Sequence, residues 1–183
     1  KYGPEALSQA LEEAKEVPLE GVFTVKDVSR ELRILFEEGI QPGAKTGWRN
    51  FDKLCTFETG RICVVTGVPG AGKSEFVDEL VMRLNLNHGW KTVFFSPENM
   101  PLTYHLRKLM EKAGGRPFCR GDMPEAVYCR AERYLQANFS FIQPEEDFTV
   151  DHILEIARML VRKQGVKVLS LDPFNRFEHQ IPN

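Results

Sequence analysis

The sequence predicts an α/β protein in which a mainly parallel sheet is flanked by helices and preceded by a helical arm. Three observations carry this prediction. From Arg61 onward, short apolar runs alternate with amphipathic helical patterns. A glycine-rich loop joins the first of these runs to the first of these helices. The first forty or so residues of the chain are helical in pattern and contain no strand-like run.

The composition is ordinary for a globular protein and gives no global electrostatic signal. The chain has 183 residues, 42% of them apolar, and its 24 basic and 26 acidic side chains leave a net charge of -2. Binding to nucleic acid would therefore need a local basic patch or several assembled copies. No apolar run approaches the length of a membrane span, so we expect no membrane partner. The four cysteines form no C-x-x-C pair, which predicts reduced and mostly buried thiols.

The sequence predicts a helical arm over residues 1–41 and the main domain over residues 42–183. An apolar face at Leu7, Ala10, Leu11 and Ala14 indicates a first helix. We expect a second helix to begin at Thr24 as N-cap, with Asp27 three residues on, and to end at Gly39. The proline and glycine of the Gln41–Thr46 stretch are typical of a linker.

In the main domain, the sequence predicts four strands that alternate with four helices. The strands are expected at Ile62–Thr66, Thr92–Ser96, Phe139–Ile142 and Val166–Leu171. The helices are expected at Lys73–His88, Pro101–Ala113, Pro124–Gln136 and from the cap residue Thr149 to Gly165. Strands that alternate with helices of this length predict right-handed crossovers and parallel pairing.

A complete phosphate-binding motif lies between the first predicted strand and its helix. The residues are Gly67-Val68-Pro69-Gly70-Ala71-Gly72-Lys73-Ser74, which match G-x-x-x-x-G-K-[ST]. Glycines let successive backbone N–H groups point into one concavity, and the following helix adds its positive end. Lys73 is expected to contact the terminal phosphates, and Ser74 is expected to bind Mg²⁺. The motif therefore predicts binding of a nucleoside triphosphate, ATP with Mg²⁺.

Two acidic residues follow strands whose carboxyl ends are expected on the same edge as this loop. Asp172 ends the apolar run Val168–Leu171, where a second magnesium residue is needed. Glu98 follows the second strand, in Ser96-Pro97-Glu98-Asn99, where it is a candidate to orient the attacking water. Position alone also allows Glu98 to be an ordinary surface glutamate.

The order of these motifs resembles a known family. Thr46-Gly47-Trp48, the phosphate loop, Ser96-Pro97-Glu98-Asn99 and Leu171-Asp172-Pro173-Phe174-Asn175, followed by Glu178-His179-Gln180, are similar to the helicase half of the Twinkle-type replicative primase-helicases of phages and organelles. These are relatives of the DnaB-type ring helicases. The resemblance covers essentially the whole chain, and Lys1–Glu5 resembles the exit from a TOPRIM domain.

The resemblance implies a RecA-like P-loop NTPase core that works as a hexameric ring on single-stranded DNA. It implies that Lys73, Asp172 and Glu98 are catalytic, with Glu98 as the residue that activates water. It also implies a linked TOPRIM primase-like domain, an arm that packs on a neighbouring subunit, and a cytoplasmic or organellar location. The family's sensor strand, DNA-binding loops and arginine finger have no counterpart among these 183 residues. We therefore expect a C-terminally truncated core that hydrolyses ATP weakly or not at all by itself.

Other assignments remain open at this stage. A recombinase-type RecA-like ATPase shares the phosphate loop, although Ser96–Asn99 favours the helicase. A small-molecule kinase lacks its usual arginine-rich lid here. A non-catalytic module that only holds a ring together would keep the loop without turnover.

Overall fold

The computed structural model describes residues 21–40, 42–97, 99–143 and 149–172. The chain divides into two compact units, Lys1–Pro42 and Gly43–Asn183. In the first unit the described helix is α2, Ser29–Glu38, which has no buried residue. The predicted helix at Leu7–Ala14 lies outside the described residues.

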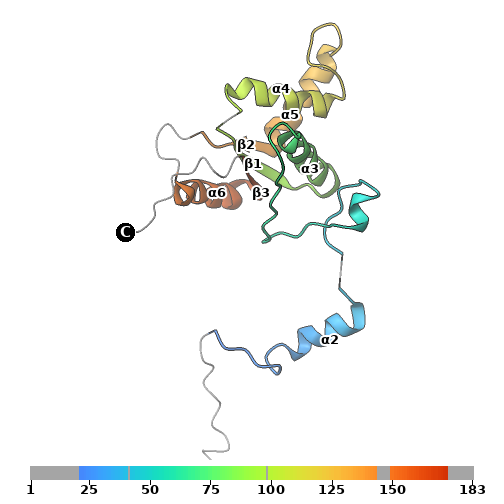
Figure 1. The fold of residues 1–183 in the computed structure, drawn as a ribbon, viewed down its shortest axis with the longest axis vertical. Helices are drawn as coiled ribbons and strands as arrows, with labels where there is room; N and C mark the ends of the chain where they lie inside the picture. Colours follow the sequence, from blue (N-terminus) through green and yellow to red (C-terminus); the bar gives the residue numbers. More distant parts are fainter. Residues whose placement is uncertain (1–20, 41, 98, 144–148, 173–183) are drawn as a thin grey trace, which may run out of the picture. The chain divides into compact units, whose positions relative to one another are not determined.

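The second unit is built on a parallel sheet of three strands in the part that the structure describes (Figure 1). The central strand is β1, Lys91–Phe95, which pairs with β2, Phe139–Phe141, on one side and with β3, Val166–Leu171, on the other. All pairs are parallel, as the strand–helix alternation predicts. The predicted α/β class with a parallel sheet and flanking helices is confirmed.

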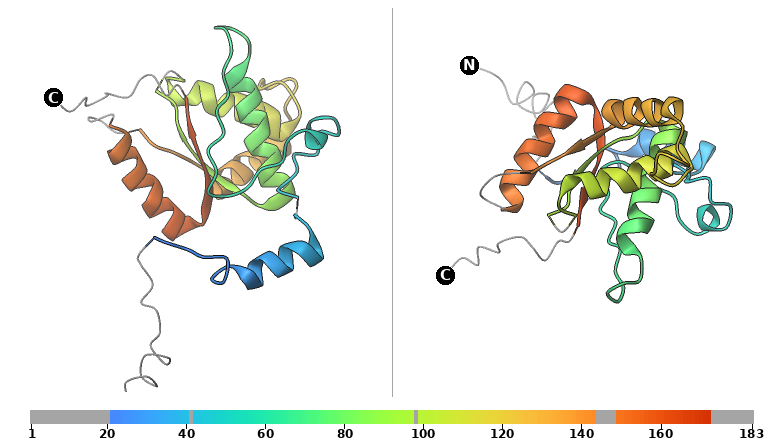
Figure 2. Two further views of the ribbon diagram at one scale, coloured as in Figure 1. Left: turned by 60° about the horizontal axis from the view of Figure 1, so that its bottom comes forward. Right: turned by 90° about the horizontal axis from the view of Figure 1, so that it is seen from above.

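Helices cover both faces of this sheet (Figure 2). One face carries α3 (Lys73–His88), α4 (Leu102–Gly114) and α5 (Glu125–Asn138), and the other carries α6 (Val150–Gln164). Alternate residues of β1 serve the two layers: Phe94 packs with α3, α4 and α5, while its neighbours on either side pack with α6. The core is therefore two apolar layers that share the central strand.

The main-domain helices begin and end close to their predicted residues. Thr149 caps α6, where its hydroxyl accepts a hydrogen bond from the backbone N–H of His152. The helices α3, α4 and α6 each end at a glycine with positive φ, at Gly89, Gly115 and Gly165.

The prediction of a strand at Ile62–Thr66 is wrong for this structure. These residues form no helix or strand, and Ile62 and Val64 are 93% and 79% exposed. A strand forms only where a neighbour satisfies its backbone groups, and no described strand pairs with this segment. A sequence pattern reports the β tendency of a segment but not whether a partner strand is present.

Two smaller expectations also fail. The helix α2 begins at Ser29 rather than after Thr24, because Asp27 accepts hydrogen bonds from the N–H and hydroxyl of Thr24 and closes a separate turn there. The thiols are free as expected but not mostly buried: Cys55, Cys63 and Cys119 are exposed. They lie in irregular segments rather than on the inner faces of helices.

Among the described residues, no helix is both long enough and apolar enough to span a lipid bilayer.

Candidate functional site

The glycine-rich loop turns directly into α3. Gly70 and Gly72 adopt φ values of 76° and 80°, a region that other residues rarely enter, and Gly72 is the N-cap of the helix. Lys73 and Ser74 are the first two residues of α3, so their backbone N–H groups have no partner within the helix. This geometry aims N–H donors and the positive end of the helix dipole at one place, which suits a phosphate group.

The ammonium group of Lys73 lies over the loop. Its Nζ donates hydrogen bonds to the carbonyl oxygens of Gly67 and Val68, each at 3.0 Å. The lysine stem runs beside Gly67, where a Cβ would lie 3.7 Å from Cδ of Lys73, an ordinary van der Waals contact. The charge is thus held inside the curve of the loop, within reach of an anion bound there.

Asp172 shares a cavity with this loop. A cavity of about 250 Å³ is lined by Lys73 and Ser74 on one side and by Lys167–Asp172 on the other. The backbone N–H of Asp172 donates to the carbonyl oxygen of Phe95 at 3.0 Å, which continues the pairing of β3 with β1. The structure therefore brings three of the predicted site residues, Lys73, Ser74 and Asp172, to the walls of one cavity.

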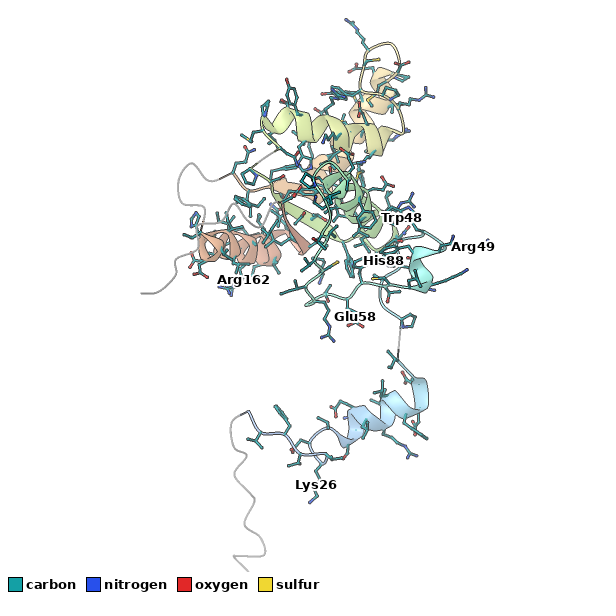
Figure 3. The ribbon with its side chains drawn as sticks, viewed as in Figure 1. Lys26, Trp48, Arg49, Glu58, His88 and Arg162 are labelled. Atoms are coloured by element: carbon teal, nitrogen blue, oxygen red, sulfur yellow. The ribbon has the colours of Figure 1, made fainter. Side chains whose placement is uncertain are left out.

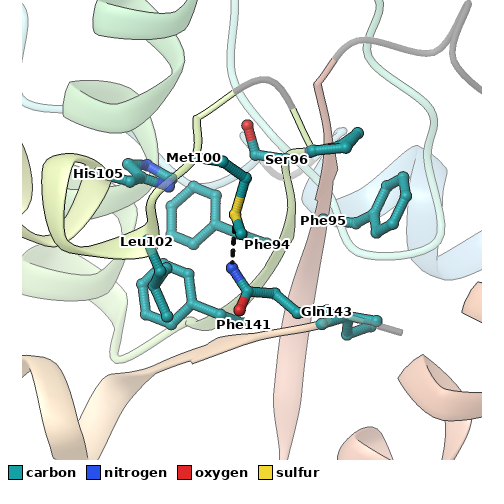
Figure 4. Close-up of a pocket in the computed structure, with 10 residues that line it drawn as sticks. Phe94, Phe95, Ser96, Met100, Leu102, His105, Phe141 and Gln143 are labelled. Atoms are coloured by element: carbon teal, nitrogen blue, oxygen red, sulfur yellow. Dashed lines mark hydrogen bonds between the residues drawn. The ribbon is translucent and has the colours of Figure 1, made fainter. Parts of the chain in front are cut away.

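Glu98 lies outside the described residues, but its flanking residues are described. They form a turn in which Asn99 donates from its backbone to the carbonyl of Ser96 and from Nδ2 to the Ser96 hydroxyl, at 3.1 and 2.7 Å. Ser96, Pro97 and Met100 line a separate cavity of about 140 Å³ at the carboxyl ends of β1 and β2 (Figure 4). Gln143 donates to Sδ of Met100 across it.

The oxygen atoms at the cavity with Lys73 fit magnesium and a triphosphate. Mg²⁺ prefers hard oxygen ligands and is usually held by one or two protein groups together with phosphate oxygens. The hydroxyl of Ser74 and the carboxylate of Asp172 supply groups of this kind. In the part of the chain that the structure describes, no three His, Cys, Asp or Glu side chains gather as a metal cluster.

Sequence reasoning missed a set of charged contacts directly after the phosphate motif. Glu75 lies between Lys108 and Lys112 of α4, with both Nζ–Oε distances 2.9 Å. The hydrogen bond from Lys108, joined by that from Lys112, outweighs partial burial and lowers the pKa of Glu75; the same contact raises the pKa of Lys108. The sequence alone shows only that Lys108 and Lys112 share one face of a helix, because no pattern identifies which helix lies opposite.

A second missed contact is fully buried. His105 Nε2 lies 3.0 Å from Oδ1 of Asp78, and the two side chains are 2% and 5% exposed. The sequence does carry a signal for this contact. Asp78 and His105 each occur among apolar positions, on the faces of α3 and α4 that pack inward.

The aromatic rings of Trp48 and Phe51 pack against Phe76 of α3. The Trp48 ring stacks on Phe76 at 5.4 Å between centroids, and Arg83 lies over it at 4.9 Å. Figure 3 labels Trp48 and His88 in this region. Asp52 accepts three hydrogen bonds from Thr46 and Gly47; burial opposes the effect, but these bonds lower its pKa. These contacts support a packing role for Trp48.

Comparison with known proteins gives one relative and no matching family model. The relative is the Twinkle homolog protein, chloroplastic/mitochondrial, of Arabidopsis thaliana, which is 34% identical over 189 residues. The alignment covers 97% of this chain but 26% of the relative, so the chain spans about a quarter of that protein's length. Over nearly its whole length, the chain is homologous to a segment of this Twinkle homolog protein.

Proposed function

We propose that this chain is the nucleotide-binding part of an ATP-dependent replicative DNA helicase of the Twinkle type. One observation carries the proposal: Lys73 and Ser74 at the start of α3 and Asp172 at the end of β3, two segments far apart in the sequence, line a single cavity beside a loop shaped for phosphate. The homology to a Twinkle homolog supports the choice of helicase over other P-loop ATPases.

Each side chain then has a distinct task. The N–H groups at the start of α3 and the ammonium of Lys73 bind the phosphates and offset the charge that develops on them during transfer. To reach a bound γ-phosphate, Lys73 exchanges its two loop carbonyls for phosphate oxygens. Ser74 and Asp172 hold Mg²⁺, which neutralises phosphate charge when bound. Glu98 accepts the proton of the attacking water.

The wider assignment rests on the same homology. We infer a RecA-like core in residues 42–183 and a linker arm in residues 1–41, within a ring that is hexameric and moves on single-stranded DNA. The TOPRIM primase-like domain precedes the arm in this proposal. The exposed apolar residues of α2, which include Leu32, Leu35 and Phe36, support a role for the arm in contacts between subunits.

Binding of ATP to a Lys73→Ala variant tests the proposal. Charge-assisted contacts of Lys73 with phosphate are worth about 1.5–3 kcal/mol, so the affinity should fall about tenfold or more. Isothermal calorimetry on the folded full-length protein measures this, with Lys53→Ala as the control because Lys53 is exposed on the short helix Phe51–Lys53. Equal ATP affinity in Lys73→Ala and Lys53→Ala would refute the phosphate role.

A further inference from the structure

The interface between α3 and α4 is built from acid–base pairs as well as apolar contacts. Glu75 and Asp78 on α3 face Lys108, Lys112 and His105 on α4. The basic residues recur at intervals of three, four and seven, so they share one face of α4. The two acids are separated by one turn in the first part of α3, immediately after Lys73 and Ser74.

The Asp78–His105 pair is the buried centre of this interface. Both side chains are almost fully inaccessible, and their 3.0 Å contact is a hydrogen bond in a water-excluded environment. The imidazole ring lies edge-on to Phe94 at 4.8 Å and to Phe141 at 5.6 Å between centroids. The two aromatic rings fix the plane of the imidazole, so its Nε2 can meet Asp78 in one arrangement only.

Stability alone is a weak reason for such a pair. Burying charged or strongly polar groups costs desolvation free energy, and apolar residues of similar size usually stabilise a core as well or better. A buried hydrogen bond differs from an apolar contact in being directional, because it is satisfied at one register of the two helices. The property that the pair confers is therefore a fixed position of α4 on α3.

The position of α4 on α3 affects the nucleotide site because both helices begin beside segments that belong to this site. The first turn of α3 holds Lys73 and Ser74. The first residue of α4, Leu102, follows the short segment that leaves β1 and includes the Ser96–Asn99 turn. His105 itself lines the cavity formed by Ser96, Pro97 and Met100, as Figure 4 shows. One end of this segment is held by the sheet and the other by α4.

We propose that Asp78 and His105 are positioning residues, whose buried pair fixes α4 on the phosphate-loop helix and thereby sets the segment between β1 and α4 for ATP hydrolysis. The ion pairs of Glu75 with Lys108 and Lys112 assist from the partly exposed edge of the same interface. This inference rests on the proposed ATPase function and names residues that contact neither phosphate nor magnesium.

The test separates a positioning role from a merely structural one in the full-length protein. The double variant Asp78→Ala/His105→Leu replaces the pair with apolar side chains of similar combined size. It should melt no earlier than wild type. It should bind ATP within about twofold of wild type, because Lys73 and Ser74 are intact. Its kcat should fall about 10- to 100-fold, as expected when a site is displaced by a fraction of an ångström to one ångström.

Conservative and edge variants complete the test. His105→Gln keeps an N–H donor for Asp78 and should retain kcat within a few-fold. Lys108→Met/Lys112→Met leaves no buried charge, so it should fold and lower kcat several-fold at unchanged ATP affinity. The control is Arg107→Met, which breaks an ion pair with Glu111 within α4 and should leave kcat unchanged.

The outcomes test the positioning role of Asp78 and His105 separately from the proposed ATPase function. A folded wild-type protein that hydrolyses no ATP overturns the proposed function. Turnover by wild type together with wild-type kcat in the apolar double variant overturns the positioning role alone. If Asp78→Ala/His105→Leu does not fold, the lysine double variant decides. A kcat of Lys108→Met/Lys112→Met within twofold of the kcat of Arg107→Met would then overturn the positioning role.

Discussion

At the scale of single residues, the buried amide of Asn85 shows how closely the polar groups between the helices are paired by hydrogen bonds. Asn85 is 5% exposed, yet its amide is fully engaged: Oδ1 accepts from the Tyr134 hydroxyl at 2.7 Å, and Nδ2 donates to Asn138 and to the carbonyl of Trp90. This network ties α3 to α5 and to the start of β1. Because each donor has one acceptor here, removal of a single partner leaves a buried polar atom unsatisfied.

Tyr134→Phe should therefore destabilise the domain by about 1 kcal/mol or somewhat more, measured by urea unfolding at pH 7. Tyr128→Phe is the control, since its hydroxyl makes only a 3.4 Å contact with Glu132, and it should change stability by about 0.5 kcal/mol or less. An equal effect in the two variants would mean that the Asn85 network contributes nothing particular.

The same tyrosine predicts a dependence on alkaline pH. Burial raises the pKa of Tyr134 from 10.0 to about 12. A raised pKa means that the folded state favours the protonated form, so this contribution is complete below pH 10.0 and is lost as pH rises toward 12. The stability difference between wild type and Tyr134→Phe should narrow over that range in unfolding curves taken at successive pH values.

Glu98 carries the sharpest prediction about chemistry. If it acts only on the attacking water, Glu98→Gln in the full-length protein should bind ATP with nearly unchanged affinity. Its steady-state hydrolysis should fall about 100-fold or more, the usual contribution of a general base. Glu155→Gln, on the exposed side of α6, is the control. Phosphate release from Glu98→Gln within a few-fold of the control would assign the role to another acid.

At the scale of elements, the sequence predicted well those whose signals are local. The extent of α3 and β3, the glycine ends of three helices and the Thr149 cap follow from motifs within each segment. The phosphate loop and Asp172 are likewise predicted from motif and position, and the structure places Lys73, Ser74 and Asp172 on one cavity. The sequence does not show which surfaces come into contact. Whether Ile62–Thr66 is paired and whether Asp78 meets His105 both depend on residues far away in the chain.

The segment before α3 offers a test of one such contact. Gly43 precedes Ala44, which forms an antiparallel bridge with Phe57. A Cβ at Gly43 would lie 2.6 Å from the carbonyl oxygen of Phe57. Gly43→Ala must therefore displace backbone and should cost about 1–3 kcal/mol in thermal or urea unfolding.

Gly121→Ala is the matched control for this substitution. A Cβ there would meet nothing within 4 Å, so stability should change by about 0.5 kcal/mol or less. A Gly43→Ala variant as stable as Gly121→Ala would show that the bridge to Phe57 yields without cost.

At the scale of the whole molecule, the sheet is open on one side in the part that the structure describes. The outer edge of β3 has no described neighbour, and the Arg61–Val65 segment lies across the same 250 Å³ cavity from it. Open edges of this kind are normally covered or paired. A strand between β3 and this segment would complete the sheet, and we expect the Arg61–Val65 segment to become a strand only where such a partner is present.

Amide hydrogen exchange of residues 1–183 and of the full-length protein tests this expectation. In the isolated chain, the amides of residues 62–65 should exchange rapidly, while those of Val93–Phe95 in the central strand should be protected. In the full-length protein, both sets should be protected. Rapid exchange of residues 62–65 in both proteins would mean that the segment never becomes a strand.

The attachment of the segment at residues 45–46 has a mechanical consequence. Asn87 donates to the carbonyl oxygen of Thr46 and His88 lies 2.8 Å from that of Lys45, so the chain is fastened to the far end of α3 soon after the arm. Tension on the arm therefore reaches the Ala44–Phe57 bridge first and the contacts with Asn87 and His88 directly after it. A helix of 16 residues is a stiff rod of about 24 Å, and its opposite end is the phosphate loop. Tension on the arm is therefore passed to α3, whose opposite end carries the phosphate loop.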